Sequence, residues 1–180
     1  MSQRRLRFAC VCLPALIVCM VLGHAPAVRA QQNGCAMVPD DANPDGRMLR
    51  CQNGLTIHAA RGTHYRLLYE PGSSQPGAAR FDAGALLIEL DPAGSAKSFQ
   101  ILTPHAIAAV RGTRWAMEVT PLQTSTLVIA GTVVVARPSE ATGVLVGPGH
   151  GVDAASDRTP LTVKVWEPAR VKALLARFGR

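Results

Sequence analysis

Aromatic and charged residues are scarce in this 180-residue chain. Two Trp, two Tyr and four Phe are the whole aromatic supply, and charged residues make up 17%. Such a sequence has little material for a sugar-binding platform of stacked rings. The patterns that catalysis needs are also missing. The histidines after residue 30 do not stand at metal-ligand spacings, and no serine lies in a nucleophile-elbow frame. We therefore predict no enzymatic activity, no metal site and no cofactor.

The first 30 residues have the three parts of a secretory signal peptide. A head with three arginines precedes an apolar run from Phe8 to Leu22, and small residues follow up to Ala30. We expect cleavage after Ala30 and a periplasmic or secreted product. The alternative, a permanent anchor, needs an apolar run of about 20 residues. Cleavage removes four of the 19 basic residues and no acid, so the net charge becomes 15 − 12 = +3. This mild charge does not indicate a nucleic-acid partner.

Cysteine usage agrees with export. Three of the five cysteines lie in the signal segment, which leaves Cys35 and Cys51. An even pair in an exported chain predicts a disulfide that ties the N-terminal segment, residues 31–54. The alternative is a redox-active pair, although the spacing is longer than the usual C-x-x-C device.

From residue 55 to 166 the chain alternates between short apolar segments and turn signals. Trp115, Met117 and Val119 alternate with other residues, and segments 64–69, 86–90 and 161–165 behave alike. Period two marks strands with one buried face. Continuously apolar runs at 127–130 and 133–135 predict strands that are buried on both faces. We predict an all-β domain, with solenoid-like, sandwich-like and barrel arrangements left open.

Residues 167–180 predict one C-terminal amphipathic α-helix. Pro168 suits the first helical position, and Gly179 suits the stop. An apolar stripe recurs at i, i+3, i+4 and i+7. It consists of Val171, Leu174, Leu175 and Phe178. The stripe predicts either a helix that caps one end of the β domain, or a docking surface for a partner protein or an acidic membrane.

The tripeptide Arg-Gly-Thr occurs twice, at 61–63 and 111–113, in the same local frame. Each copy follows a segment that starts with Ile, and Tyr65 and Leu67 stand opposite Trp115 and Met117. A repeated strand–turn–strand unit predicts stacked or coiled strands. A turn that is used twice indicates scaffold, and we predict no catalytic residue in it.

Residues 101–135 resemble the FecR domain family. Its pattern is a strand that ends in Thr-Pro, then small and apolar residues, Arg-Gly-Thr, a strand, and a glycine before valines. Flanking segments 81–90 and 144–152 also resemble the family, so the resemblance spans about residues 55–155. The matching motif residues are Thr103, Pro104, Arg111, Gly112, Thr113 and Gly131.

These motif residues are predicted to be structural. Pro104 cannot donate to a strand ladder and suits a strand edge or start. Gly112 and Gly131 suit sharp bends. We expect Arg111 to hydrogen-bond carbonyls at such a bend, with its stem packed on the strand. A ligand contact of Arg111 is the alternative.

The resemblance implies signalling outside the cytoplasm. Typical family members hold a sigma factor with a cytoplasmic segment and carry this domain beyond a membrane-spanning helix. Here only the predicted signal peptide precedes the domain, so we expect no direct sigma-factor contact. We predict a non-enzymatic interaction or signalling accessory module that binds an unidentified envelope or membrane protein. The alternative is a module for cell-envelope glycan or peptidoglycan, which a paired aromatic platform on the surface would favour.

Overall fold

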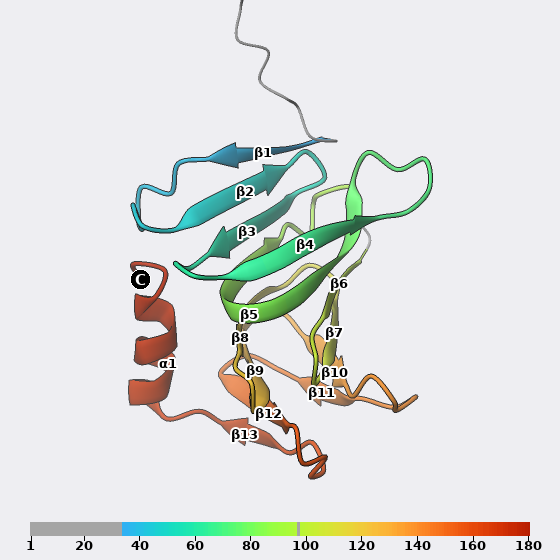
Figure 1. Ribbon diagram of the computed structural model, residues 1–180, viewed down its shortest axis with the longest axis vertical. Coiled ribbons are helices and arrows are strands. Elements are labelled where there is room, and N and C mark those ends of the chain that lie inside the picture. The colour runs from blue at the N-terminus through green and yellow to red at the C-terminus, as the bar shows by residue number, and fades with distance from the viewer. Residues whose placement is uncertain (1–33, 97) are drawn as a thin grey trace, which may run out of the picture. The chain divides into compact units, whose positions relative to one another are not determined.

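The computed structural model describes residues 34–96 and 98–180, so the predicted signal peptide lies outside it. The described residues form thirteen strands and one helix (Figure 1). In chain order these are β1 (Cys35–Val38), β2 (Arg47–Cys51), β3 (Leu55–Ala59), β4 (His64–Tyr69), β5 (Pro76–Leu90), β6 (Phe99–Leu102), β7 (Ile107–Val110), β8 (Arg114–Val119), β9 (Gln123–Ala130), β10 (Val133–Ala136), β11 (Val144–Val146), β12 (His150–Ala155), β13 (Val163–Val165) and α1 (Pro168–Ala176).

The strands form two bent sheets that share the 15-residue strand β5 (Figure 1). Sheet I has the order β1-β2-β3-β5-β8-β9-β12-β13. Sheet II has the order β4-β5-β6-β7-β10-β11. The first half of β5 belongs to sheet II and the second half to sheet I. All these pairings are antiparallel except the one between β5 and β6. The prediction of an all-β fold is confirmed, and the strands form a nearly closed, barrel-like sheet.

The core lies between the inner faces of the two sheets. Sheet I contributes Trp115 and Met117, and sheet II contributes Phe81 and Phe99, all of them buried. The alternation seen in the sequence of β8 therefore marks its buried face. Burial of apolar area at about 25 cal/mol per Å² makes this contact the main stabilising term of the fold.

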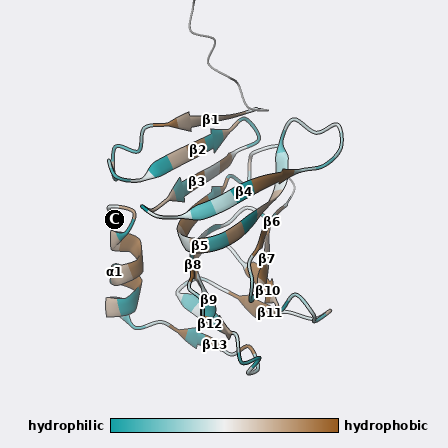
Figure 2. Cartoon of the chain, viewed as in Figure 1, coloured by the Kyte–Doolittle hydropathy of each residue, from teal (hydrophilic) through white to brown (hydrophobic). Residues whose placement is uncertain are grey.

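The prediction for residues 133–135 is wrong at its centre. Val133 and Val135 are buried, but Val134 is 41% exposed. The strand β10 is apolar throughout (Figure 2), yet the outer face of sheet II has no element over Val134 among the described residues. A continuously apolar strand in this protein therefore does not mean burial on both sides.

The helix α1 covers the outer face of sheet I. It begins at Pro168, and Gly179, with φ at 72°, lies in the turn that ends it. Leu174 and Phe178 are buried in a second apolar cluster. Their partners there are Ala60, Ala85, Leu87, Ala116, Leu127 and Trp166, and Val171 and Leu175 pack at its margin. The apolar stripe thus faces the chain itself, and it covers a sheet face and not an end of the domain. In the folded chain Leu174 and Phe178 are not available as a surface for a partner.

Ion pairs hold α1 to sheet I at both ends. Arg170 donates to both carboxylate oxygens of Asp153, at 2.6 and 2.9 Å, and stacks over the Trp166 ring at 3.5 Å. Arg177 pairs with Glu118 of β8. These partners are partly exposed, so we expect the apolar contacts to dominate the stability of the docked helix.

The predicted disulfide is present. Cys35 and Cys51 stand opposite each other in the β1–β2 pair and are bonded. Both are buried at the edge of the core. The bond closes the turn-rich segment between the two strands, as the sequence indicated. Among the described residues, no helix is long and apolar enough to cross a membrane.

Candidate interaction groove

Both Arg-Gly-Thr copies lie where a strand leaves one sheet and continues in the other. The first copy joins β3 of sheet I to β4 of sheet II, and the second joins β7 of sheet II to β8 of sheet I. The antiparallel partner crosses back at Gly84 within β5 for the first copy, and at Gly131 between β9 and β10 for the second. The repeat is thus a pair of bent hairpins that connect the sheets.

The threonine of each copy packs against the glycine of the returning strand. Gly84 and Gly131 have φ values of +101° and +81°. A Cβ at Gly84 would lie 2.6 Å from the Thr63 Cα, and a Cβ at Gly131 would lie 2.6 Å from the Thr113 Cγ2. Each corner therefore needs both a left-handed backbone and a missing side chain. Gly112, with φ at +60°, lies against Pro92 in the same way.

The Thr-Pro part of the motif forms the turn between β6 and β7. Thr103 is buried, and its hydroxyl accepts the backbone N–H of Ala106 at 2.9 Å. The same hydroxyl lies 2.8 Å from the Thr124 hydroxyl of β9. Pro104 is exposed within the turn. This part of the motif therefore organises backbone.

Arg111 differs from the prediction. Its side chain is exposed and makes no hydrogen bond with another described residue. The Thr113 carbonyl of the bend instead accepts a hydrogen bond from the Leu90 N–H at 2.8 Å. Conformation at the second corner thus depends on Gly112 and Thr113.

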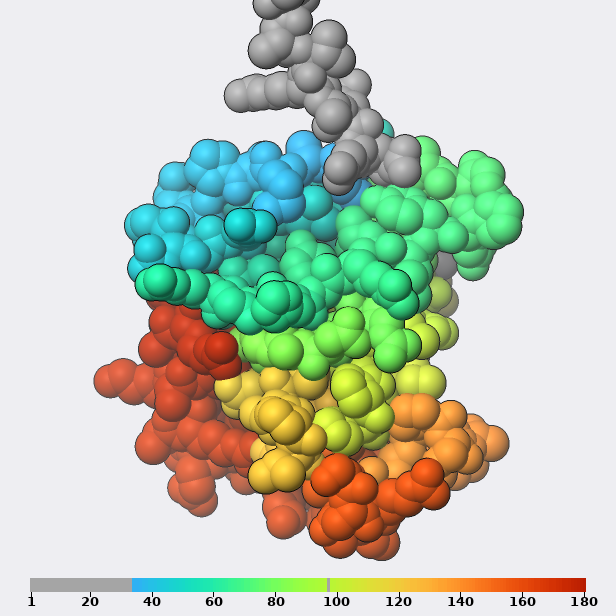
Figure 3. Space-filling model, viewed as in Figure 1, coloured from blue at the N-terminus to red at the C-terminus, as the bar shows by residue number. Residues whose placement is uncertain are grey.

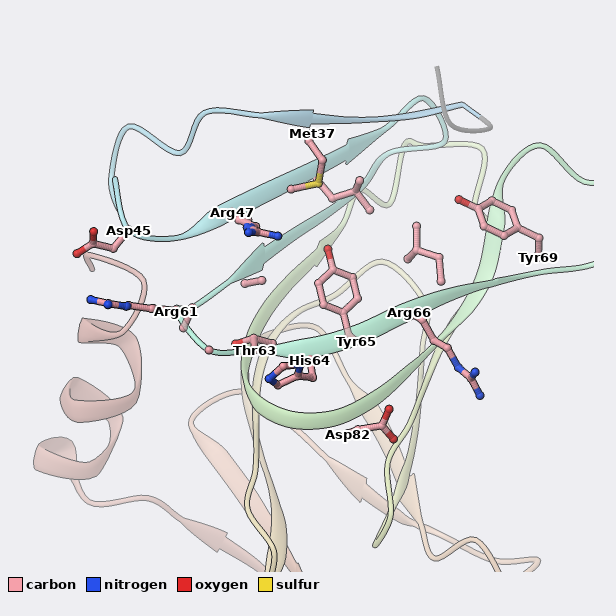
Figure 4. Close-up of a pocket in the computed structure, with 15 residues that line it drawn as sticks. Met37, Asp45, Arg47, Arg61, Thr63, His64, Tyr65, Arg66, Tyr69 and Asp82 are labelled. Carbon is pink, nitrogen blue, oxygen red and sulfur yellow. The ribbon is translucent and has the colours of Figure 1, made fainter. Parts of the chain in front are cut away.

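A groove opens where the two sheets part, between β2 of sheet I and β4 of sheet II. Its cavity volume is about 910 Å³, within the usual range of ligand sites. Its lining residues come from β1, β2, the first Arg-Gly-Thr turn, β4 and β5 (Figure 4). Met37, Arg47 and Tyr65 point toward one another between the walls, whereas Arg66 points to the other side of β4 (Figure 4).

The lining of the groove is mixed, with an apolar part and several charged residues, Asp45, Arg47, Arg61, Arg66 and Asp82. Leu49, Tyr65 and Leu67 line it, and Tyr65 and Leu67 pack on the core only in part. Burial raises the pKa of the Tyr65 hydroxyl, while the Arg47 guanidinium opposes this shift. Arg47 is exposed and has no ion pair among the described residues. A groove of this kind suits an apolar ligand that carries a carboxylate.

One wall of the groove is a strand with a free edge. The strand β4 pairs with β5 and with no other strand of the described chain. It lies at the front of the molecule without another element over it (Figures 1 and 3). Alternate residues of such a strand direct their N–H and C=O groups to solvent.

A buried His–Asp pair lies apart from the groove, on the α1 side of sheet I. His58 is 4% exposed. Its Nδ1 lies 2.7 Å from Asp40, and Arg180 and Glu89 approach its Nε2. Burial alone would raise the pKa of Asp40, but the hydrogen bond and charge of His58 bring it below its usual value. Within the described chain, no Ser, Thr or Cys side chain is hydrogen-bonded to the pair. We therefore interpret the pair as a structural contact that connects β3 to the β1–β2 loop and to the C-terminus.

Other polar groups also have structural partners. The Ser125 hydroxyl donates to Asp153 at 2.7 Å, beside the Arg170 ion pair. Across residues 34–96 and 98–180, no three His, Cys, Asp or Glu side chains are placed to hold a metal ion.

The sequence interpretation missed the groove. It assigned Tyr65, Leu67 and Tyr69 to a buried face because they alternate, whereas all three are half-buried. Arg47 has no motif around it. The available signal was the short spacing between the first Arg-Gly-Thr turn and these tyrosines, but it does not reveal that β4 lacks a second neighbour.

Comparison with known proteins agrees with the motif. The family model described as FecR protein matches residues 46–134. This segment is therefore a FecR domain, as the resemblance implied. No curated protein matches the chain.

Two crystal structures of candidate anti-sigma factors from Parabacteroides distasonis ATCC 8503 share the fold. For the first, the TM-score is 0.60 and the sequence identity is 16%, and the aligned region covers 78% of this chain and 64% of the neighbour's chain. For the second, the TM-score is 0.54 and the sequence identity is 18%, and the aligned region covers 80% of this chain and 61% of the neighbour's chain. The chain therefore spans less than two thirds of the length of either neighbour. At these identities the likeness concerns the fold.

Proposed function

We propose that this protein is an exported FecR-domain module that binds another protein of the cell envelope and thereby serves signalling, without catalysis. The FecR domain and the fold of its structural neighbours support a regulatory role. The observation that carries the binding role is the open groove beside the free edge of β4, the edge that does not pair with β5. Such a combination suits recognition of a protein segment.

Periplasmic or secreted placement belongs to the same proposal. Its support is the signal-peptide pattern of residues 1–30 and the disulfide between Cys35 and Cys51, which persists in oxidising compartments. Processing would leave residues 31–180, with 31–54 tied by the disulfide, 55–166 as the FecR-like β body and 167–180 as the helical end.

Binding of a glycan is the second candidate function. Tyr65 and Tyr69 both line the groove, and tyrosine rings are common sugar contacts. They stand four residues apart on one strand, about 13 Å at the usual rise. At this spacing the two rings would contact separate sugar units of a glycan chain, not the two faces of one sugar.

Site-specific photocrosslinking in cells tests the proposal. A photoreactive amino acid replaces Met37, which is 56% exposed in the groove, or Leu122, which is 72% exposed in the β8–β9 turn and serves as the matched control. We expect a discrete envelope protein to be crosslinked from position 37 and not from 122. Crosslinks to glycan strands alone would support the second function. Equal crosslinking from both positions, or none, would contradict the proposed binding role of the groove.

A further inference from the structure

The second Arg-Gly-Thr hairpin has a neighbouring strand on each side of β8, whereas the first hairpin has a neighbouring strand on only one side of β4. In both copies the strand after the tripeptide pairs with the returning strand of its own hairpin, β4 with β5 and β8 with β9. The other edge of β8 is also paired, antiparallel to the second half of β5. The corresponding edge of β4 has no partner within the described chain. The repeat therefore contains one position for an antiparallel strand that no strand of residues 34–96 and 98–180 fills.

The surroundings of that edge fit a strand with one apolar face. On β8 the added strand places Leu86 and Ile88 into the core. Beside β4 the matching space is the groove, whose walls are apolar at Leu49 and Leu67. Side chains of an added strand would alternate between this groove and solvent.

The positive charge of Arg47 in the groove favours a bound segment that carries a carboxylate. Arg47 is the guanidinium that points between the walls, and no carboxylate of the described residues is paired with it. Asp82, also at the groove, is already engaged by Arg80 at 3.0 Å. A carboxylate on the occupant would meet Arg47 in partly apolar surroundings, where such a contact is stronger than in water.

We propose that the groove receives an extended segment of a partner protein, which adds to the free edge of β4 as an antiparallel strand, buries alternate apolar side chains and places a carboxylate at Arg47. This inference rests on the proposed binding function and gives it a mode and a chemistry. The regular stretch of β4 between its two irregularities, residues 65–68, spans about 13 Å, so the segment forms one short strand.

Peptide display on the disulfide-bonded unit Gln31–Arg180 tests the proposal without knowledge of the partner. Random octapeptides are selected, and enriched peptides are then synthesised and their Kd measured. We expect aliphatic or β-branched residues in alternate positions and at least one Asp or Glu. Arg47→Glu should weaken binding about tenfold or more. Arg50→Glu is the matched control, because Arg50 is exposed on the opposite face of the same strand, and it should change Kd by less than about twofold.

Backbone methylation of the selected peptide tests strand addition itself. Only one edge of the bound peptide can pair with β4, and successive amides of a strand point to opposite edges. N-methylation of the amides that point to β4 should therefore abolish binding, whereas N-methylation of the alternate set should leave the Kd nearly unchanged. Hydrogen exchange should show new protection in β4.

Several outcomes would overturn the proposal. These are no enrichment over the Arg47→Glu chain, equal tolerance of both methylation patterns, or a dimer in solution that forms through β4. If crosslinking from position 37 still captures an envelope protein, the proposed function stands and only strand addition fails. If both experiments fail, the binding function fails with it.

Discussion

Replacement of Gly131 by alanine would test whether the Arg-Gly-Thr corner is scaffold. Gly131 has a φ of +81°, and an alanine Cβ there would lie 2.6 Å from the Thr113 Cγ2 and 2.9 Å from the Gly112 carbonyl oxygen. The left-handed backbone alone costs an alanine about 1–2 kcal/mol. Relief of the two contacts adds about 1–3 kcal/mol, typical of overpacking. We expect the free energy of unfolding to fall by about 2–5 kcal/mol, a large part of the stability of a single domain.

Gly62 of the first copy is the matched control. Its φ is +74°, but an added Cβ would meet no atom within 4 Å. Gly62→Ala should therefore cost only the backbone term, about 1–2 kcal/mol. Urea unfolding of the oxidised unit, followed by the fluorescence of Trp115 and Trp166, compares the two variants. A second change, Thr113→Ser, removes the closest methyl group and should restore part of the Gly131→Ala loss.

Equal losses for Gly62→Ala and Gly131→Ala would refute the steric part of the reasoning. A restored stability in the double variant would localise the effect to the contact between the two strands. Loss of partner binding without loss of stability would instead assign the corner a direct functional role.

Three further predictions concern the rest of the fold. Phe178→Ala should lower the free energy of unfolding by about 3–5 kcal/mol and raise amide exchange throughout α1, because this fully buried side chain fixes the helix to sheet I. Serine at both Cys35 and Cys51 should cost about 3 kcal/mol in the chain-entropy model, as measured by urea unfolding with and without reductant. The pKa of Asp40 is lowered when folded, so its carboxylate stabilises the protein above its ordinary pKa of about 4 and this contribution is lost as the pH falls through the folded value. Asp40→Asn should therefore flatten the acid limb of the curve of stability against pH, whereas an unchanged limb would show that the contact with His58 contributes little.

Local pattern predicted the elements of this fold well where one face of a strand is buried. The alternation of Trp115 and Met117 marks the core face of β8, and the stripe of α1 marks its contact with a sheet. Both patterns follow from the period of a single element. The corner glycine Gly131 was also predictable, since a left-handed backbone favours glycine.

Features that depend on distant neighbours were not predictable in this way. Val134 looks like its buried neighbours, and only the bare outer face of sheet II exposes it. His58 and Asp40 meet across 18 positions through the fold of the β1–β2 loop. The free edge of β4 is likewise a property of the sheet order, which a strand's own residues do not encode.

The free edge of β4 carries features that restrict what can pair with it. The ladder with β5 is irregular between His64 and Tyr65 and again between Leu68 and Tyr69, and such irregularities twist an edge away from flat association. Arg66 adds a charge on the side of β4 that faces away from the groove. Only the short stretch between the irregularities is then regular enough for a new ladder, and its inward side chains face Arg47 and the apolar wall. The irregular ends of β4 limit the length and the register of any strand that pairs with it, and the groove selects the side chains of that strand. An edge that must avoid aggregation and still accept one particular strand needs both restrictions.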